Sequence, residues 1–232
     1  MQTHKHNMHY RKKVHGFCSM LIAVVVMAFG MNAKAEVREI TVWEVLPGHV
    51  DEFQAGIKRA QEIASKYGDV RISSNFQGQM IFASYHENWL AWNKYWQKLI
   101  QDKEWQKVLA DGRAAGRAKV LNGSLQNLVA ATENPGSINA YQIFFWKPMP
   151  GQDARMYQEA IKFKEIHESY GAKVSIWSNR AGNMAYQLGF NTWEDMAKFM
   201  DTPQPKFVEY WNETRANPAS TMTGHSIGSA IQ

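Results

Sequence analysis

Apolar and polar residues alternate in three short segments in the first half of the chain. Such alternation is typical of strands that bury one face, and it predicts strands at Val37–Leu46, Val70–Phe76 and Gln79–Tyr85. Pro47-Gly48 ends the first strand, and Gln77-Gly78 is a plausible hairpin turn between the other two.

Between and after these strands, apolar residues recur every three or four positions, which is typical of one helix face. The first stripe comprises Phe53, Ile57, Ala60, Ile63, Ala64 and Tyr67, and Gly68 follows it as the expected helix end. The second stripe comprises Trp89, Trp92, Trp96 and Leu99. A further helix is predicted from Trp105 to about Lys119, followed by a weak strand at Leu125–Ala130.

The second half of the chain repeats the first. Pro47-Gly48 and Pro150-Gly151 are 103 residues apart, as are Tyr67-Gly68 and Tyr170-Gly171. After one inserted residue the separation becomes 104, for example between Trp89 and Trp193. Matches in the same order at a nearly fixed separation indicate a tandem duplication.

The second copy predicts the same elements as the first. They are strands at Ile138–Lys147, Lys173–Asn179, Met184–Phe190 and Thr221–Ile227, with helices at Ala154–Tyr170, Trp193–Met200 and Lys206–Arg215. Residues 133–137 are the linker between a first unit at 36–132 and a second at 138–232. Each unit has the β-α-β-β-α-β order of the ferredoxin-like fold. The predicted class is therefore α+β, with two units that cover their free sheet faces by closing against each other.

Residues 1–35 form a separate segment. A basic start with Arg11-Lys12-Lys13 precedes 15 largely apolar residues, Phe17–Met31, and Ala33 and Ala35 occupy the small-residue positions of a signal-peptide cleavage site. The alternative is an uncleaved anchor, but a spanning helix normally needs about 20 apolar residues. We therefore expect cleavage before Glu36, a periplasmic or secreted protein, and no membrane span after cleavage.

The net charge of +5 arises from this same segment, which holds five basic residues and no acidic one. The remaining residues contain 21 basic and 21 acidic side chains. A neutral body offers no broad surface for phosphates, so nucleic-acid binding is not expected.

Cys18, the only cysteine, lies in the apolar run, so the mature chain has no disulfide and no thiolate.

Motifs for metal or cofactor chemistry are absent from the sequence. The four histidines after residue 36, His49, His86, His167 and His225, have none of the spacings of metal sites. No glycine-rich phosphate loop follows a strand, and no Gly-x-Ser-x-Gly element occurs. No cofactor and no metal are therefore expected.

The two-copy organisation resembles the dimeric α+β barrel superfamily, in which two ferredoxin-like units build one barrel. Within it, Trp89–Leu109 (WLAWNKYWQKLIQDKEWQKVL) is similar to NIPSNAP and antibiotic-biosynthesis-monooxygenase-type domains. Those domains place an aromatic-rich helix after the third strand, followed by an acidic-x-x-Trp element, here Asp102–Trp105. The resemblance implies a barrel closed within one chain. It also implies a pocket between this helix and the sheet, which in the relatives holds a flat aromatic substrate or haem.

The candidate site combines this resemblance with the tryptophans, all nine of which lie after residue 36. Ligand-binding candidates are Trp89, Trp92, Trp96 and Trp43. Asn93 and His86 are the candidate catalytic residues, which would polarise a substrate oxygen by hydrogen bonding. The alternative is that the tryptophans form the core face of the helix, that Asn93 faces solvent, and that His86 lies on the surface at a strand end.

The second copy lacks the polar candidates. Its aligned residues are Phe190, Trp193, Met196, Ala197 and Met200, so any single pocket is expected in the first copy. The polar candidates on the first strand are Thr41, Trp43 and Glu44. Trp89–Ile100 contains no histidine at the place where haem-degrading relatives carry their axial ligand.

Three functions remain open. The first is an exported barrel enzyme, monooxygenase-like and cofactor-independent, that acts on a small aromatic or quinone-like compound. The second is a non-catalytic binding protein for a hydrophobic ligand or haem, and the third is a stress or interaction module. The expected partner is a small hydrophobic or aromatic molecule. Because one chain contains both copies, it is expected to be a monomer or a weak homo-oligomer.

Overall fold

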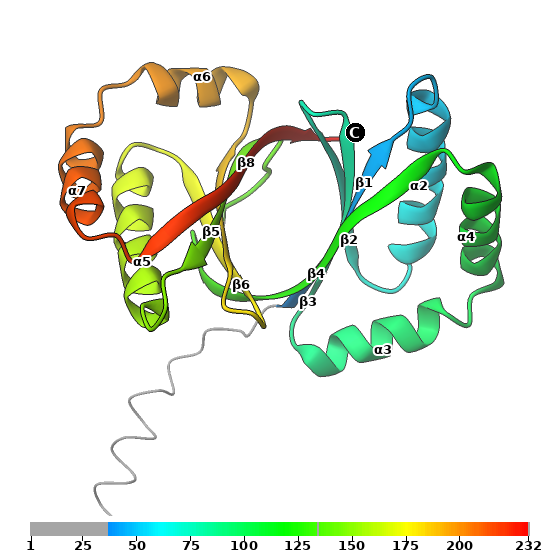
Figure 1. Ribbon diagram of the computed structural model, residues 1–232. Coiled ribbons are helices and arrows are strands. Elements are labelled where there is room, and N and C mark those ends of the chain that lie inside the picture. Colours follow the sequence, from blue (N-terminus) through cyan, green and yellow to red (C-terminus); the bar gives the residue numbers. More distant parts are fainter. Residues whose placement is uncertain (1–36, 134, 232) are drawn as a thin grey trace, which may run out of the picture. The chain divides into compact units, whose positions relative to one another are not determined.

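The computed structural model describes residues 37–133 and 135–231, and the predicted signal peptide lies outside the described residues. Two successive halves show the same order of elements (Figure 1). The first half contains β1 (Val37–Val45), α2 (Val50–Ala64), β2 (Asp69–Asn75), β3 (Gln79–His86), α3 (Trp89–Leu99), α4 (Lys103–Ala115) and β4 (Ala118–Ala131). The second half contains β5 (Ala140–Pro148), α5 (Asp153–Ser169), β6 (Lys173–Asn179), β7 (Met184–Phe190), α6 (Trp193–Asp201), α7 (Pro205–Ala216) and β8 (Ser220–Ala230).

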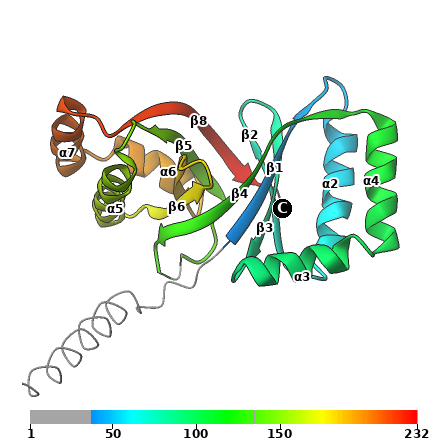
Figure 2. The same cartoon turned by 60° about the horizontal axis from the view of Figure 1, so that its bottom comes forward.

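The eight strands close into one antiparallel barrel in the order β1-β3-β2-β8-β5-β7-β6-β4. Each half supplies a ferredoxin-like sheet, β4-β1-β3-β2 or β8-β5-β7-β6, and the halves join where β4 pairs with β6 and β2 pairs with β8. Helices α2–α4 lie outside the barrel on one side and α5–α7 on the other (Figures 1 and 2). The predicted α+β class and the barrel closed within one chain are thus confirmed.

The inward face of the strands buries polar and aromatic side chains. The Arg38 guanidinium lies 4.1 Å from the ring centre of Trp177, a cation–π contact. Its Nε atom donates to Gln126 Oε1 at 2.7 Å, and its Nη1 atom donates to Gln187 Oε1 at 3.1 Å. These contacts join residues of both halves, so the barrel interior is a shared core.

Two further contacts join the halves outside the barrel. Phe76, on the β2–β3 hairpin, stacks on Trp193 at the start of α6 with ring centres 5.1 Å apart. Arg180, on the β6–β7 hairpin, lies 5.3 Å from the ring centre of Trp89 at the start of α3. Hairpin and helix thus meet in the same way on both sides of the barrel.

The end of the first half differs from the sequence prediction. The helix expected to reach Lys119 ends at Ala115, because Gly116 adopts a left-handed conformation with φ of 61°. The following strand, β4, has 14 residues rather than the predicted six, because β1 and β6 pair with its two edges.

Among the described residues, no helix is both long and apolar enough to cross a membrane.

Candidate functional site

A cavity of about 800 Å³ lies in the second half, between the outer face of β5 and β7 and the helices α5, α6 and α7. Ligand pockets typically enclose about 300–1,000 Å³, so its size suits a small organic molecule. Most of its wall is aromatic or aliphatic: Phe144, Trp146, Met156, Ala160, Phe163, Met184, Leu188, Phe199, Met200, Phe207, Trp211 and Met222. Its polar lining includes Gln142, Glu159, His167, Tyr186, Thr214, Arg215 and Ser220.

Strand alternation and helix periodicity place these side chains on the wall. Gln142, Phe144 and Trp146 are every second residue of β5, and they pair with Leu188, Tyr186 and Met184 of β7. Phe207, Trp211 and Arg215 lie four residues apart on α7, which puts them on one helix face. The floor of the cavity is therefore the sheet, and α7 forms part of its cover.

One polar pair lies within this apolar wall. His167 Nδ1 is 2.8 Å from the hydroxyl of Tyr186, and the imidazole lies among the rings of Phe163, Phe199 and Phe207. Burial lowers the pKa of His167 to about 4, so the ring is neutral at pH 7. Burial also raises the pKa of Tyr186 well above its usual value, so the hydroxyl keeps its proton.

The proton of Tyr186 determines the tautomer of His167. If the hydroxyl donates to Nδ1, the imidazole proton must be on Nε2, and only that N–H remains without a partner. The reverse arrangement would leave two groups unpaired, the hydroxyl proton and the Nε2 lone pair. Because Nε2 has no hydrogen bond to any described residue, it is available to a ligand, as a donor in the favoured tautomer.

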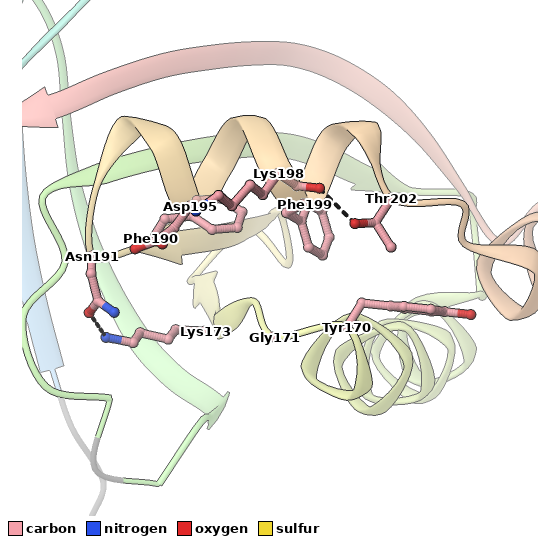
Figure 3. Close-up of a pocket in the computed structure, with 9 residues that line it drawn as sticks. All are labelled: Tyr170, Gly171, Lys173, Phe190, Asn191, Asp195, Lys198, Phe199 and Thr202. Atoms are coloured by element: carbon pink, nitrogen blue, oxygen red, sulfur yellow. Dashed lines mark hydrogen bonds between the residues drawn. The ribbon is translucent and has the colours of Figure 1, made fainter.

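A smaller pocket of about 280 Å³ lies between α6 and the end of α5 and shares Phe199 and Thr202 with the cavity (Figure 3). Its two lysines are already engaged. Lys173 Nζ donates to Asn191 Oδ1 and to the carbonyl oxygen of Ser137, and Lys198 Nζ pairs with Glu194 at 2.8 Å. The smaller pocket therefore offers less to a ligand than the large cavity does.

Two of the predicted tryptophans, Trp92 and Trp96, contact a residue that the sequence analysis did not name, Glu39. Trp92 Nε1 donates to Glu39 Oε2 at 2.8 Å, and Trp96 Nε1 donates to the same oxygen at 2.5 Å. Glu39 lies on β1 and is thus a further polar residue of the first strand, beside the candidates Thr41, Trp43 and Glu44. Two indole N–H groups on one carboxylate fix α3 against β1.

The other predicted residues lie apart from one another. His86 is 7% exposed; its Nε2 lies 2.9 Å from Ser84 Oγ, and its ring is 4.7 Å from that of Tyr95. Burial lowers the pKa of His86. Asn93 is exposed on α3, which corresponds to the solvent-facing alternative. Trp43 packs against Phe53 and Phe82.

None of the residues that line the large cavity belongs to the first half. In the first half, Trp105 is 7% exposed and lies against Phe82 and Trp96, with ring centres 6.2 and 6.5 Å away. Trp105 is the third residue of α4, and Phe207 is the third residue of α7. In the first half, larger rings thus fill the space between sheet and helices that the cavity occupies in the second half. Ligand binding by Asn93, His86 and their neighbours stays a prediction.

His167 is the residue of the cavity that the sequence most nearly indicated. At the separation of 103 residues it corresponds to Ala64, so the second copy has a histidine where the first has a small apolar residue. The same comparison sets Met200 against Trp96 at a separation of 104. A histidine in place of an apolar residue, together with a methionine in place of a tryptophan, is the signal that could have indicated a cavity in the second half.

Solved structures share this arrangement. A protein called "Putative monooxygenase" from Fusobacterium nucleatum superposes with a TM-score of 0.62 and 8% identity, over 87% of this chain and 94% of that one. An "anthrone oxidase-like protein" superposes with a TM-score of 0.57 and 6% identity, over 87% of this chain and 93% of that one. The fold is the dimeric α+β barrel.

A third solved structure, a "Putative Chlorite dismutase", gives a TM-score of 0.54 and 12% identity, over 85% of this chain and 95% of that one. No protein-family model matches the chain, and no curated protein matches it in sequence. Identities this low show the fold alone, so the site must be argued from its own residues. Within residues 37–133 and 135–231, no three His, Cys, Asp or Glu side chains are grouped so as to hold a metal ion.

Proposed function

We propose that the protein binds a small aromatic or quinone-like molecule in the cavity of the second half. The observation that supports this is the combination of an apolar cavity of about 800 Å³ with a single buried polar pair, His167 and Tyr186. Flat rings pack well on the aromatic wall. The Nε2–H of His167 donates a hydrogen bond to a ligand oxygen, which orients the ligand.

The reaction we propose for this site is a cofactor-independent oxygenation, which the names of the structural neighbours support by analogy of fold. Without a cofactor, the substrate itself must supply the electrons that reduce O2. Conversion of a ring-activated CH2 group to a carbonyl, with one O2 consumed and one water formed, satisfies this balance. A hydrogen bond from His167 to the substrate oxygen stabilises the negative charge of the enolate that forms when the CH2 group gives its proton to solvent.

The binding proposal is tested with N-phenyl-1-naphthylamine, a neutral fluorescent probe of apolar sites. The wild-type protein is expected to bind one equivalent. Ala160 is 3% exposed on α5 and lines the cavity, so Ala160→Phe should fill part of it and weaken binding at least about tenfold. Circular dichroism on the variant checks that it folds.

Asn93→Ala is the matched variant for the first half. If the cavity of the second half is the site, Asn93→Ala leaves the affinity unchanged. Loss of binding in Asn93→Ala and not in Ala160→Phe would instead place the site in the first half. Oxygen uptake with a panel of anthrone- and quinol-type compounds separates turnover from binding alone.

Haem is the alternative occupant, and one observation favours it. The imidazole of His167 is neutral at pH 7, and its Nε2 has no described partner. To hold iron, His167 would take the reverse tautomer, in which Nδ1–H donates to the Tyr186 hydroxyl oxygen and the Nε2 lone pair is free for the metal. The same proteins titrated with haem should then show a shifted Soret band. His167→Ala should remove the shift, and an unchanged band in His167→Ala would reject this occupant.

We also propose that the protein is exported, on the basis of residues 1–35. Cleavage after Ala35 would give a mature chain that begins at Glu36. The intact mass of the protein from the periplasm or culture fluid is expected to correspond to residues 36–232. A full-length mass in the membrane fraction would contradict export by cleavage.

A further inference from the structure

The charged groups on the wall of the cavity are unequally satisfied. With His167 neutral, the charged lining residues are Glu159 on α5 and Arg215 on α7. Glu159 Oε1 accepts from Arg155 Nε at 2.8 Å, so its negative charge is compensated. Arg215 is exposed at the end of α7 and forms no hydrogen bond or ion pair with any described residue. The wall thus carries one uncompensated positive charge.

Further donors without partners line the same cavity. Trp211 is one helical turn before Arg215 on the same face of α7, and the Trp146 ring lies 6.1 Å from the Trp211 ring. Neither indole N–H has a hydrogen bond to a described residue, and neither has the Ser220 hydroxyl. In the first half, by contrast, Trp92 and Trp96 both donate to the carboxylate of Glu39. The cavity wall therefore holds donors that no described residue uses, of the kind that bind an acidic group.

These observations lead us to infer that the ligand of the cavity is an amphipathic anion, a carboxylate or sulfonate with a flat apolar body. The inference rests on the proposed binding function. Its acidic group lies at Arg215, and its body extends along α7 past Trp211 towards Phe207, whose ring is 5.0 Å from that of His167. Eight helical residues span about 12 Å, which matches a body of two or three fused or linked rings.

A helix C-terminus also favours an arginine in its last turn, because the side chain interacts with the helix dipole. That interaction explains a positive charge anywhere around the last turn of α7. It does not explain why Arg215 lies on the cavity face, where Trp211 and Phe207 precede it. An anionic ligand accounts for that position.

Two probes with the same ring system test this inference. N-phenyl-1-naphthylamine is neutral, and 8-anilinonaphthalene-1-sulfonate adds only a sulfonate. In Arg215→Gln, the affinity for the sulfonate is expected to fall about tenfold, whereas the affinity for the neutral probe stays within about twofold. Added salt should weaken sulfonate binding in the wild-type protein and much less in Arg215→Gln. Lys206→Gln removes the same charge from the exposed start of α7, outside the cavity, and should change neither affinity.

The outcomes separate this inference from the proposed function. Equal sulfonate affinity in wild type and Arg215→Gln overturns the anionic ligand, as does an equal loss in Lys206→Gln. Binding of the neutral probe that is lost in Ala160→Phe supports the cavity in either case. If the neutral probe does not bind, or binds Ala160→Phe as well as wild type, the proposed function itself fails. A melting temperature for Arg215→Gln equal to that of wild type shows that the comparison reports binding.

Discussion

Replacement of Gly228 by alanine should destabilise the barrel by about 3 kcal/mol, at the upper end of the usual cost of overpacking. A Cβ atom at Gly228 would lie 2.2 Å from the carbonyl oxygen of Ser74 and 2.5 Å from the Tyr141 hydroxyl. Ser74 belongs to β2, so the clash is with backbone that no side-chain rotation can move. The strands β2 and β8 would have to separate along the short ladder that joins Ser73–Asn75 to Gly228–Ala230.

The loss should appear as a fall in melting temperature of about 6–12 °C for a chain of this size. Gly123→Ala is the control, because Gly123 also lies in a barrel strand, β4, and the nearest atom to its Cβ would be the carbonyl oxygen of Ile40 at 3.9 Å. We expect its melting temperature to stay within about 2 °C of wild type. A Gly228→Ala variant as stable as wild type would mean that β2 and β8 do not pair closely in solution.

The sequence was sufficient to predict most of the elements and their order. Strand alternation identified β2, β3, β6 and β7 to within a residue or two, because hairpin turns mark one end of each. The comparison of the two halves supplied the architecture, since two exposed sheet faces in one chain can cover each other. The length of β4 could not be predicted in this way. Its first residues pair with β1 alone, and Val120 and Leu121 are exposed, so no alternation marks them.

The location of the cavity depends on differences in volume between equivalent positions. Sequence reasoning gave weight to polar residues, Asn93 and His86, and expected any single pocket in the first copy because the second copy lacks them. Whether a helix leaves space above a sheet is decided by several side chains together, here Met200 and Phe207 against Trp96 and Trp105. The combined volume of these side chains can be judged only once the packing of three helices on two strands is known. Glu39 was missed for a related reason, because its contact with α3 joins residues more than 50 positions apart.

The second prediction addresses this difference in volume directly. Trp105→Ala should lower the free energy of unfolding by about 3–5 kcal/mol, the usual cost of removing a buried tryptophan. Trp105 is 7% exposed and packs on Phe82 and Trp96, so its removal leaves a hole lined by aromatic rings. Asn93→Ala, on the exposed face of α3, should change the same free energy by no more than about 0.5 kcal/mol. Urea unfolding followed by circular dichroism measures both.

The hole should also create a second binding site. Apolar cavities opened in a core stay dry and accept apolar ligands, so Trp105→Ala should bind indole, a molecule of the size of the ring removed, as a second equivalent beside the one N-phenyl-1-naphthylamine that wild type binds. The double variant Trp105→Ala/Ala160→Phe, whose natural cavity is filled, should still bind indole and lose most of its affinity for N-phenyl-1-naphthylamine. A Trp105→Ala variant that keeps wild-type stability and loses probe binding would show the opposite arrangement, with Trp105 serving a ligand site in the first half. If stability falls and a second equivalent binds, the tryptophans of the first half are core, and only the smaller side chains of the second half leave room for a ligand.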